Sequence, residues 1–456
     1  MSFASVHFVL FALTFFLLIF FFEKKWKIIS ILFSLFFYSY WSPGLSLLLI
    51  FSVLHTFFIG NLIFENKNNS KLFLIIGICV SLSILFIFKY FNFFISDLAN
   101  ISLKNSIFER IILPIGISFY TFQSISYLVD IYKEKIKPSS FQNLTIFIIF
   151  FPQLVAGPIV RASNLIPQIE RGIKINLNNF KKGIMLIIWG YFLKLCVSNN
   201  LDVYVNSIYN FIGESNTPTL LITSIFYSFL IYADFCGYSL IAIGILKTLG
   251  FNVPANFLTP YFSKNLTEFW RRWHISLSKF LRDYFYIPIG GNKYGLFKSM
   301  RNILLVMTVG GLWHGASINF VIWGFLHGTI LCFEKIIGKL QLNINFSFLS
   351  KILTFILVTI LWIPFSIPDF NQLKIFISIF NISNIFDFGQ IIEKFQVVKN
   401  LFLIFVLILL DILFTKKNLV KIKNNYFILG LTFILVVGLI LTFGIFDEKK
   451  FIYFQF

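Results

Sequence analysis

Length, composition and charge separate this chain from soluble proteins. Its 456 residues are 58% hydrophobic and 12% charged, with a mean hydropathy of +0.85. Soluble domains carry about 45–50% apolar and about 25% charged residues, so an ordinary soluble domain is excluded. We expect a single all-α, polytopic membrane domain over residues 1–456.

The net charge of +19 does not indicate nucleic-acid binding, because no basic domain stands apart from the apolar runs. Basic residues form short clusters between those runs, as in Glu23–Lys27 and Lys133–Lys137, which suits loops facing anionic membrane lipid. The four cysteines are isolated and show no CxxC spacing, so we expect buried thiols. No metal-binding or nucleotide-binding motif occurs, so we expect no bound metal and no tightly bound cofactor.

The first five apolar runs follow the positive-inside rule as membrane spans. The first run lacks a preceding basic stretch and a cleavage site, which favours a retained span with the N-terminus outside. Polar or basic loops after the first, third and fifth runs then face the cytoplasm. These runs are Val6–Phe22, Ile28–Trp41, Leu45–Phe64, Leu72–Ile95 and Ile111–Tyr132.

The simple alternation fails between residues 141 and 300. Phe141–Ala156 is short for a full crossing, and charged or proline-bearing stretches interrupt the region. Irregular or re-entrant backbone is tolerated in a membrane where it lines a cavity, so we expect the functional interior here. Later runs bring the expected total to ten to twelve spans: Ile303–Leu326, Ile352–Ile367, Leu401–Phe414 and Tyr426–Phe446.

Histidine 314 is the leading chemical candidate among the five histidines at positions 7, 55, 274, 314 and 327. It lies within Gly310–Ser317, inside a long apolar run, where ionisable residues are costly and often functional. The neighbouring glycines favour close approach of a substrate, or equally tight packing between helices. A neutral histidine is a natural general base for a hydroxyl. We expect no chemical role for His7 or His55.

The second candidate, His274, lies in a predicted amphipathic helix over Asn265–Tyr284. Asn265 and Glu268 predict the helix start. One face is aromatic, and the other carries Arg271, Arg272, Lys279, Arg282 and Asp283. The pattern is typical of an interfacial helix, with His274 at the edge of the aromatic face. An interfacial histidine without chemistry is the alternative.

The stretch Phe151–Arg161 cannot form a regular helix, because it contains two prolines and a glycine. Its polar side chains are Gln153 and Arg161. Buried irregular backbone in a membrane usually lines a cavity, although a kinked connector fits this stretch equally well.

Together these stretches resemble the membrane-bound O-acyltransferase family, and in particular the bacterial branch with the membrane subunit of alginate O-acetylation. The order and spacing of the motifs match that pattern over about residues 110–330. The carrying segments are Pro114–Asp130, Phe151–Arg161, Asp234–Ser239, Glu268–His274, Leu281–Tyr284 and Gly311–Ser317.

The resemblance implies a ring of helices around a tunnel, with His314 as the catalytic base and His274 as a second polar group. Under this interpretation His274 positions or hydrogen-bonds the reacting groups, and the basic edge of its helix attracts the phosphates of the donor. Further candidates for substrate or tunnel contacts are Gln153, Arg161, Trp270, Arg271, Arg282, Asp283, Tyr284, Trp313 and Asn319.

The resemblance also implies a reaction. Acetyl-coenzyme A is the expected acyl donor on the cytoplasmic side, and the acetyl group moves across or within the membrane. His314 deprotonates the attacking hydroxyl or helps form an acyl carrier that passes the group outward. The acceptor is an extracytoplasmic polysaccharide, either an exopolysaccharide or peptidoglycan. A separate extracytoplasmic transferase or esterase-like protein is the expected partner, and the bacterial cytoplasmic (inner) membrane is the expected location. D-alanyl transfer from a carrier protein to teichoic acid is the alternative. A transporter or flippase would need inverted repeats and intramembrane carboxylates paired across the bundle, and we expect neither.

Overall fold

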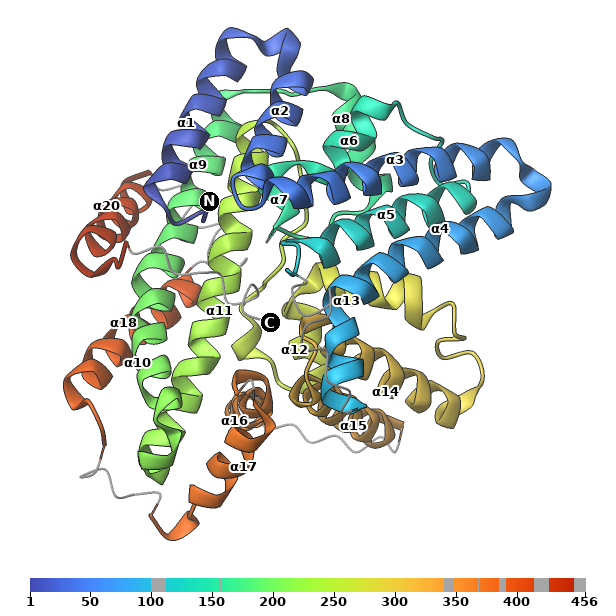
Figure 1. Ribbon diagram of the computed structural model, residues 1–456. Helices are drawn as coiled ribbons and strands as arrows, with labels where there is room; N and C mark the ends of the chain where they lie inside the picture. Colours follow the sequence, from blue (N-terminus) through green and yellow to red (C-terminus); the bar gives the residue numbers. More distant parts are fainter. Residues whose placement is uncertain are drawn as a thin grey trace. The chain divides into compact units, whose positions relative to one another are not determined.

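The computed structural model describes residues 1–99, 112–155, 157–339, 348–367, 369–384, 391–413 and 426–446 (Figure 1). Every regular element in these ranges is a helix, which confirms the all-α prediction. Seven helices are long and apolar enough to cross a membrane, or eight if one bent pair counts as a span. The prediction of ten to twelve spans is therefore not confirmed within the described ranges.

The chain divides into two compact units. The first comprises residues 1–187 and 239–254, and the second comprises residues 188–238 and 255–456. The prediction of a single domain over the whole chain stays a prediction. Helices within the first unit are α1 Val6–Phe21, α2 Trp26–Ser39, α3 Pro43–Glu65, α4 Ser70–Leu85, α5 Ile117–Tyr132, α6 Phe141–Ile149, α7 Phe151–Leu154 and α8 Ala162–Arg171.

The boundary between the units runs through two helices, α9 Leu177–Tyr191 and α11 Thr217–Thr248. Helices within the second unit are α10 Asn199–Asn210, α12 Leu266–Arg272, α13 Ile275–Leu281, α14 Gly295–His314, α15 Ile318–Lys339, α16 Leu349–Ser366, α17 Phe370–Ile379, α18 Lys394–Leu413 and α20 Tyr426–Phe443.

Several expected spans are bent or broken. The first two expected spans form one pair of helices, bent by 114° between Phe21 and Glu23. The expected span Ile303–Leu326 is wrong, because α14 ends at His314 and Gly315 is extended (φ −161°, ψ 154°). The expected short helix after residue 141 is confirmed, since α6 ends at Ile149 and only the single turn of α7 follows.

In the first unit, α5 is the central helix and packs against both α3 and α4 (Figure 1). Its residues 117–131 are all buried. Gly116, just before α5, has a left-handed backbone (φ 73°), and a Cβ there would press on the Leu154 carbonyl, so only glycine fits this turn easily. Phenylalanines fill the space beside α1 and α2, where the Phe151 ring contacts those of Phe11 and Phe15.

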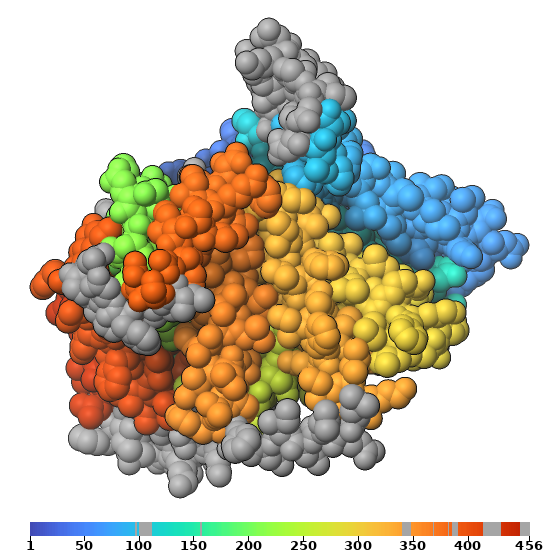
Figure 2. Space-filling model, turned by 90° about the horizontal axis from the view of Figure 1, so that it is seen from below, coloured from blue at the N-terminus to red at the C-terminus, as the bar shows by residue number. Residues whose placement is uncertain are grey.

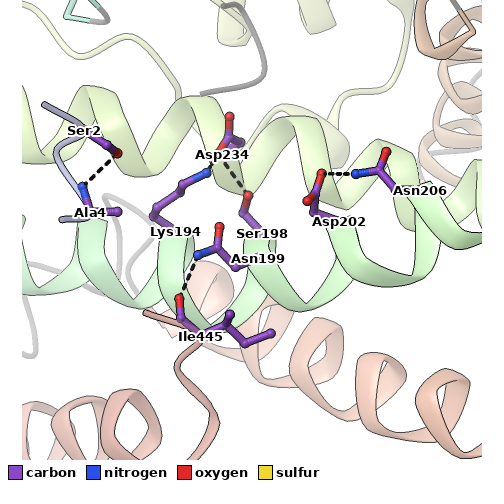
Figure 3. A network of polar contacts seen from close by, with 9 residues as sticks. All are labelled: Ser2, Ala4, Lys194, Ser198, Asn199, Asp202, Asn206, Asp234 and Ile445. Atoms are coloured by element: carbon purple, nitrogen blue, oxygen red, sulfur yellow. Dashed lines mark hydrogen bonds and ion pairs between the residues drawn. The ribbon is translucent and has the colours of Figure 1, made fainter. Parts of the chain in front are cut away.

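In the second unit, a buried ion pair joins two helical segments (Figure 3). The Lys194 ammonium, on the π-helical turn Phe192–Ser198, contacts the Asp234 carboxylate on α11, and the Ser198 hydroxyl donates to the same carboxylate at 3.0 Å. Both charged side chains are at most 3% exposed. The expectation of no paired intramembrane carboxylate was therefore wrong.

The helices α14 and α15 form a tight hairpin around the break at residues 315–317. A Cβ on Gly311 would collide with the Phe320 carbonyl oxygen, and one on Gly324 with the Met307 carbonyl oxygen. Glycines allow helix backbones to approach this closely in membrane proteins. Of the two explanations offered for the glycines near His314, close helix packing is the one seen at Gly311.

Large apolar side chains also cover part of the outer surface. Helices α16 to α18 form part of the face shown in Figure 2, in orange. On these helices Leu353, Ile360 and Phe405 are each more than half exposed. Such a surface would be costly in water and suits contact with lipid. Buried thiols were expected, and Cys196, Cys236 and Cys332 are buried, whereas Cys79 is exposed.

The glycine contact gives a first prediction. Gly311→Ala should lower the thermal stability of the purified protein, because the added methyl group forces α14 away from α15 at a cost of about 1–3 kcal/mol. Gly438→Ala in α20 is the matched control, since a Cβ there meets no atom within 4 Å. It should keep or slightly raise stability, because alanine favours helix by about 1 kcal/mol. Equal melting temperatures for both variants would contradict this packing argument.

The buried ion pair gives a second prediction. Asp234→Asn should destabilise the protein by about 3–5 kcal/mol, because the Lys194 ammonium stays buried without its counter-charge. The double variant Lys194→Met with Asp234→Asn should recover much of that loss, since both charges are removed. The stability of the single and the double variant is measured by thermal unfolding in detergent, followed by size-exclusion chromatography. A double variant no more stable than the single one would show that the charge pairing is unimportant.

Candidate functional site

Histidine 314 is the last residue of α14 and is 3% exposed. Its imidazole lies within a wall of aromatic rings from three helices, all close to perpendicular to it. The ring centroids of Trp313, Trp323 and Phe365 lie 5.0, 5.2 and 5.2 Å from that of His314. The histidine is therefore enclosed by apolar surface at the point where α14 stops.

Histidine 274 is fully buried, which corrects the prediction of an interfacial position. The predicted continuous helix over Asn265–Tyr284 was also wrong. It is broken into α12 and α13, because Trp273 is extended and His274 has left-handed backbone angles (φ 39°, ψ 54°). Such angles cost about 1–3 kcal/mol in a non-glycine residue, and they often occur at functional sites. His274 is buried at this break, whereas Arg271 and Arg282 on either side of it are exposed.

The predicted start of α12 is confirmed. The Asn265 side chain accepts a hydrogen bond from the Glu268 backbone N–H at 2.7 Å, as an N-cap does. Glu268 then accepts from the Lys264 backbone N–H at 2.8 Å and pairs with Arg272. Both of the ionic side chains in that pair stay partly exposed, so they stabilise the helix end and leave the buried site uncharged.

The imidazole of His274 is held in one orientation by Asn256. The Asn256 Oδ1 atom lies 3.1 Å from His274 Nδ1 and also accepts from the Ser276 backbone N–H (3.3 Å) and hydroxyl (2.9 Å). An atom that accepts from a backbone N–H must be the amide oxygen, so His274 Nδ1 is the donor. Burial also lowers the pKa of His274, which favours the neutral ring. A neutral ring with a proton on Nδ1 carries its lone pair on Nε2.

The two predicted histidines meet in space, as the resemblance implied. Their ring centroids are 6.5 Å apart, and Trp313 contacts both rings, at 5.8 Å from His274 and 5.0 Å from His314. His274 lies at the break between α12 and α13, and His314 is the last residue of α14, so the two are far apart along the chain. The fold therefore assembles the pair, and no local motif could have done so.

A third histidine, His327 on α15, belongs to the same cluster and was not predicted. It is fully buried and lies 4.7 Å from the Trp323 ring, the same ring that contacts His314. The Trp270 indole N–H donates to His327 Nδ1 at 3.2 Å. A signal existed in the sequence: Trp323 and His327 are four residues apart, which places them on one helix face.

Other predicted site residues have different surroundings. Asn319 is buried and donates to the Ile367 carbonyl at 2.6 Å, which ties α15 to the end of α16. Arg271 and Arg282 are exposed, and Arg282 pairs with Asp283. The Tyr284 ring, on the turn after α13, lies 4.7 Å from the Phe280 ring of α13 and is tilted by 31° to it.

Gln153 and Arg161 belong to the first unit, unlike the histidines. Gln153 is fully buried and donates to the Phe147 carbonyl at 2.7 Å, which joins α7 to the end of α6. Arg161 is half-buried and precedes α8. Their roles as substrate contacts stay predictions.

Among the described residues, no group of three or more His, Cys, Asp and Glu side chains could hold a metal ion. The arrangement around His314 offers a different chemistry. It combines a buried imidazole, a second imidazole with a fixed lone pair, and walls of aromatic rings. Such an enclosure strengthens every charge interaction within it, which suits proton transfer during attack on a carbonyl.

Comparisons with known proteins agree with this chemistry. The chain is 34% identical to a peptidoglycan O-acetyltransferase of Helicobacter pylori over 75% of its own length and 71% of that protein. It is 35% identical to a protein of Pseudomonas syringae named probable alginate O-acetylase, over 75% and 67% of the two chains. A teichoic acid D-alanyltransferase of Bacillus subtilis is 26% identical over 67% and 80%.

Residues 32–373 match the membrane-bound O-acyltransferase family, and this range holds all three clustered histidines. The match covers well over half of the chain. This chain belongs to the membrane-bound O-acyltransferase family and is a multi-pass membrane acyltransferase.

Proposed function

We propose that this protein transfers an acetyl group from a cytoplasmic thioester, acetyl-coenzyme A, to a hydroxyl for O-acetylation of an extracytoplasmic polysaccharide. The observation that carries the proposal is the contact of His274, His314 and Trp313 in one buried cluster. The names of the two relatives at 34% and 35% identity support acetyl as the group and a polysaccharide as the acceptor. Between an exopolysaccharide and peptidoglycan, both acceptors remain in the proposal.

The proposed reaction has two stages. His314 takes the proton of the attacking hydroxyl as its oxygen bonds to the thioester carbonyl carbon. The carbon–sulfur bond then breaks, and the proton passes to the leaving sulfur, which departs as a thiol. The products are an ester and a free thiol, so no further reactant is needed. The attacking hydroxyl has only the proton that His314 takes, so His274 Nε2 accepts a hydrogen bond from another N–H or O–H group of the bound substrates. His274, held by Asn256, thereby positions them.

The surrounding residues have supporting roles in this proposal. Trp313 holds the two histidine rings apart by packing against both. The exposed Arg271 and Arg282 attract the phosphates of the donor. Gln153, Arg161, Trp270, Asp283, Tyr284 and Asn319 remain candidates for contact with the substrates. The proposed location is the bacterial cytoplasmic membrane, with a separate extracytoplasmic transferase or esterase-like protein as partner.

D-alanyl transfer is the competing function within the family. The relative of that name is 26% identical, against 34% and 35% for the two acetylating relatives, so acetyl transfer is favoured. Purified protein in liposomes, supplied with a hydroxyl-bearing acceptor (polysaccharide or teichoic acid) and with either radiolabelled acetyl-coenzyme A or a D-alanyl carrier protein, separates the two. Release of thiol from the acetyl donor alone supports the proposal, and release from the carrier protein alone overturns it.

The role of His314 gives a third prediction. His314→Ala should reduce acetyl transfer about 100-fold or more, because general-base catalysis contributes about 10²–10⁴-fold. The exposed His7 on α1 provides the matched control, and His7→Ala should keep wild-type activity. Ester-linked acetate in the cell envelope, normalised to the amount of protein in the membrane, is the measurement. Wild-type acetylation by His314→Ala would overturn the catalytic assignment.

The role of Asn256 gives a fourth prediction. Asn256→Ala removes the acceptor of the His274 Nδ1 proton, so the ring can flip or change tautomer, and activity should fall about 10-fold to 100-fold. Asn256→Asp keeps an acceptor oxygen at this place and should retain more activity than Asn256→Ala. A matched control is Asn302→Ala, which removes a buried asparagine bonded to the Gly291 carbonyl at 3.1 Å. Equal activity of the alanine and aspartate variants at position 256 would contradict this orienting role.

A further inference from the structure

The proton of His327 can be assigned from its neighbour. Trp270 Nε1 lies 3.2 Å from His327 Nδ1. An indole nitrogen only donates, so Nδ1 must offer a lone pair. An imidazolium ring has no lone pair and would lose this bond. The contact therefore selects the neutral ring with its proton on Nε2, which is the opposite tautomer to that of His274.

The Nε2–H group of His327 has no hydrogen-bond partner among the described residues, although it is fully buried. Buried donors in proteins are nearly always bonded, and an unmet donor costs about 1–3 kcal/mol. The neighbouring rings of Trp323 and Trp362 offer no oxygen or nitrogen acceptor, because an indole has none. What distinguishes this buried donor is its place beside the Trp323 ring, which also contacts His314, so an acceptor atom of a bound substrate would satisfy it.

The position of His327 relates this donor to the reaction. A single indole, Trp323, contacts both His327 and His314, at 4.7 and 5.2 Å between ring centroids. The cluster thus offers a lone pair on His274 and an N–H on His327. Acyl transfer needs a base for the attacking hydroxyl, which is His314 in the proposed reaction, and a donor for the carbonyl oxygen as that oxygen gains negative charge.

We propose that His327 is a third functional histidine, whose Nε2–H donates a hydrogen bond to the carbonyl oxygen of the acyl group. This inference rests on the proposed acyl transfer. As the hydroxyl oxygen bonds to the carbonyl carbon, the carbonyl oxygen becomes an oxyanion, and it recovers its double bond when the carbon–sulfur bond breaks. His327 keeps its proton throughout and stabilises the intermediate charge. Trp270 is a positioning residue that holds the required tautomer.

The test compares variants at position 327 by the rate of thiol release from acetyl-coenzyme A in liposomes supplied with a polysaccharide acceptor. His327→Phe keeps the ring but removes the donor, and it should lower kcat about 100-fold with KM for the thioester changed little, because one oxyanion donor contributes about 10²–10³-fold. His327→Gln places an amide N–H near the position of Nε2 and should stay within about 10-fold of wild type. His55→Phe on α3 is the matched control, since His55 Nε2 is also buried without a partner, and it should keep wild-type kcat.

Trp270→Phe tests the tautomer independently of substitution at the histidine. Nitrogen-15 spectra of labelled histidine should show one fixed tautomer for His327 in the wild type and a mixture in Trp270→Phe, with kcat reduced. Wild-type kcat in a stably folded His327→Phe, or equal loss in His327→Phe and His327→Gln, would overturn the donor role. An unchanged spectrum in Trp270→Phe would overturn the role of Trp270 as the positioning residue. The His314→Ala variant separates the two proposals. Its loss of activity would support the proposed acyl transfer even if the results at position 327 overturned the donor role of His327.

Discussion

The close approach of α14 and α15 is the constraint on which the rest of the site depends. The hairpin closes because Gly311 and Gly324 present backbone to the facing carbonyls of Phe320 and Met307. This packing places His314, at the end of α14, beside Trp323 on α15. Since Trp323 and His327 share one helix face, the same contact also sets His327 near the cluster. A change of helix separation would move all of these rings together.

The second principle of the site is that polar groups in an apolar enclosure must be oriented by specific partners. Asn256 leaves a lone pair on His274, and Trp270 leaves a proton on His327. The two partners are not interchangeable, because an amide oxygen only accepts and an indole only donates. Charged side chains of α12 stay at the surface, as in the Glu268–Arg272 pair. Neutral hydrogen bonds thus fix which ring nitrogen of each histidine donates and which accepts, without the cost of buried ions.

Much of the general architecture could be predicted from the sequence, because a lipid bilayer requires an apolar composition and helices of a certain apolar length. The candidate His314 could also be predicted from the sequence, since a histidine among glycines inside an apolar run is unusual. The break at His274 could not be predicted, because the helical periodicity of the sequence continues through Trp273 and His274. The left-handed backbone of His274 is compensated by a tertiary contact with Asn256. His327 was missed because its partner Trp270 is 57 residues away. Pairings at such distances depend on the fold and not on local pattern.

The buried pair of Lys194 and Asp234 also has a consequence for how the protein is made. The two residues are 40 positions apart and lie in different candidate spans, 177–210 and 217–248. At a synthesis rate of about 5–20 residues per second, the ammonium waits roughly 2–8 seconds for its carboxylate. A lone lysine at the centre of a span costs about 2.5–3.5 kcal/mol during insertion. We therefore expect the earlier segment to stay at the translocon until α11 emerges, so that Lys194 and Asp234 enter the bilayer already paired.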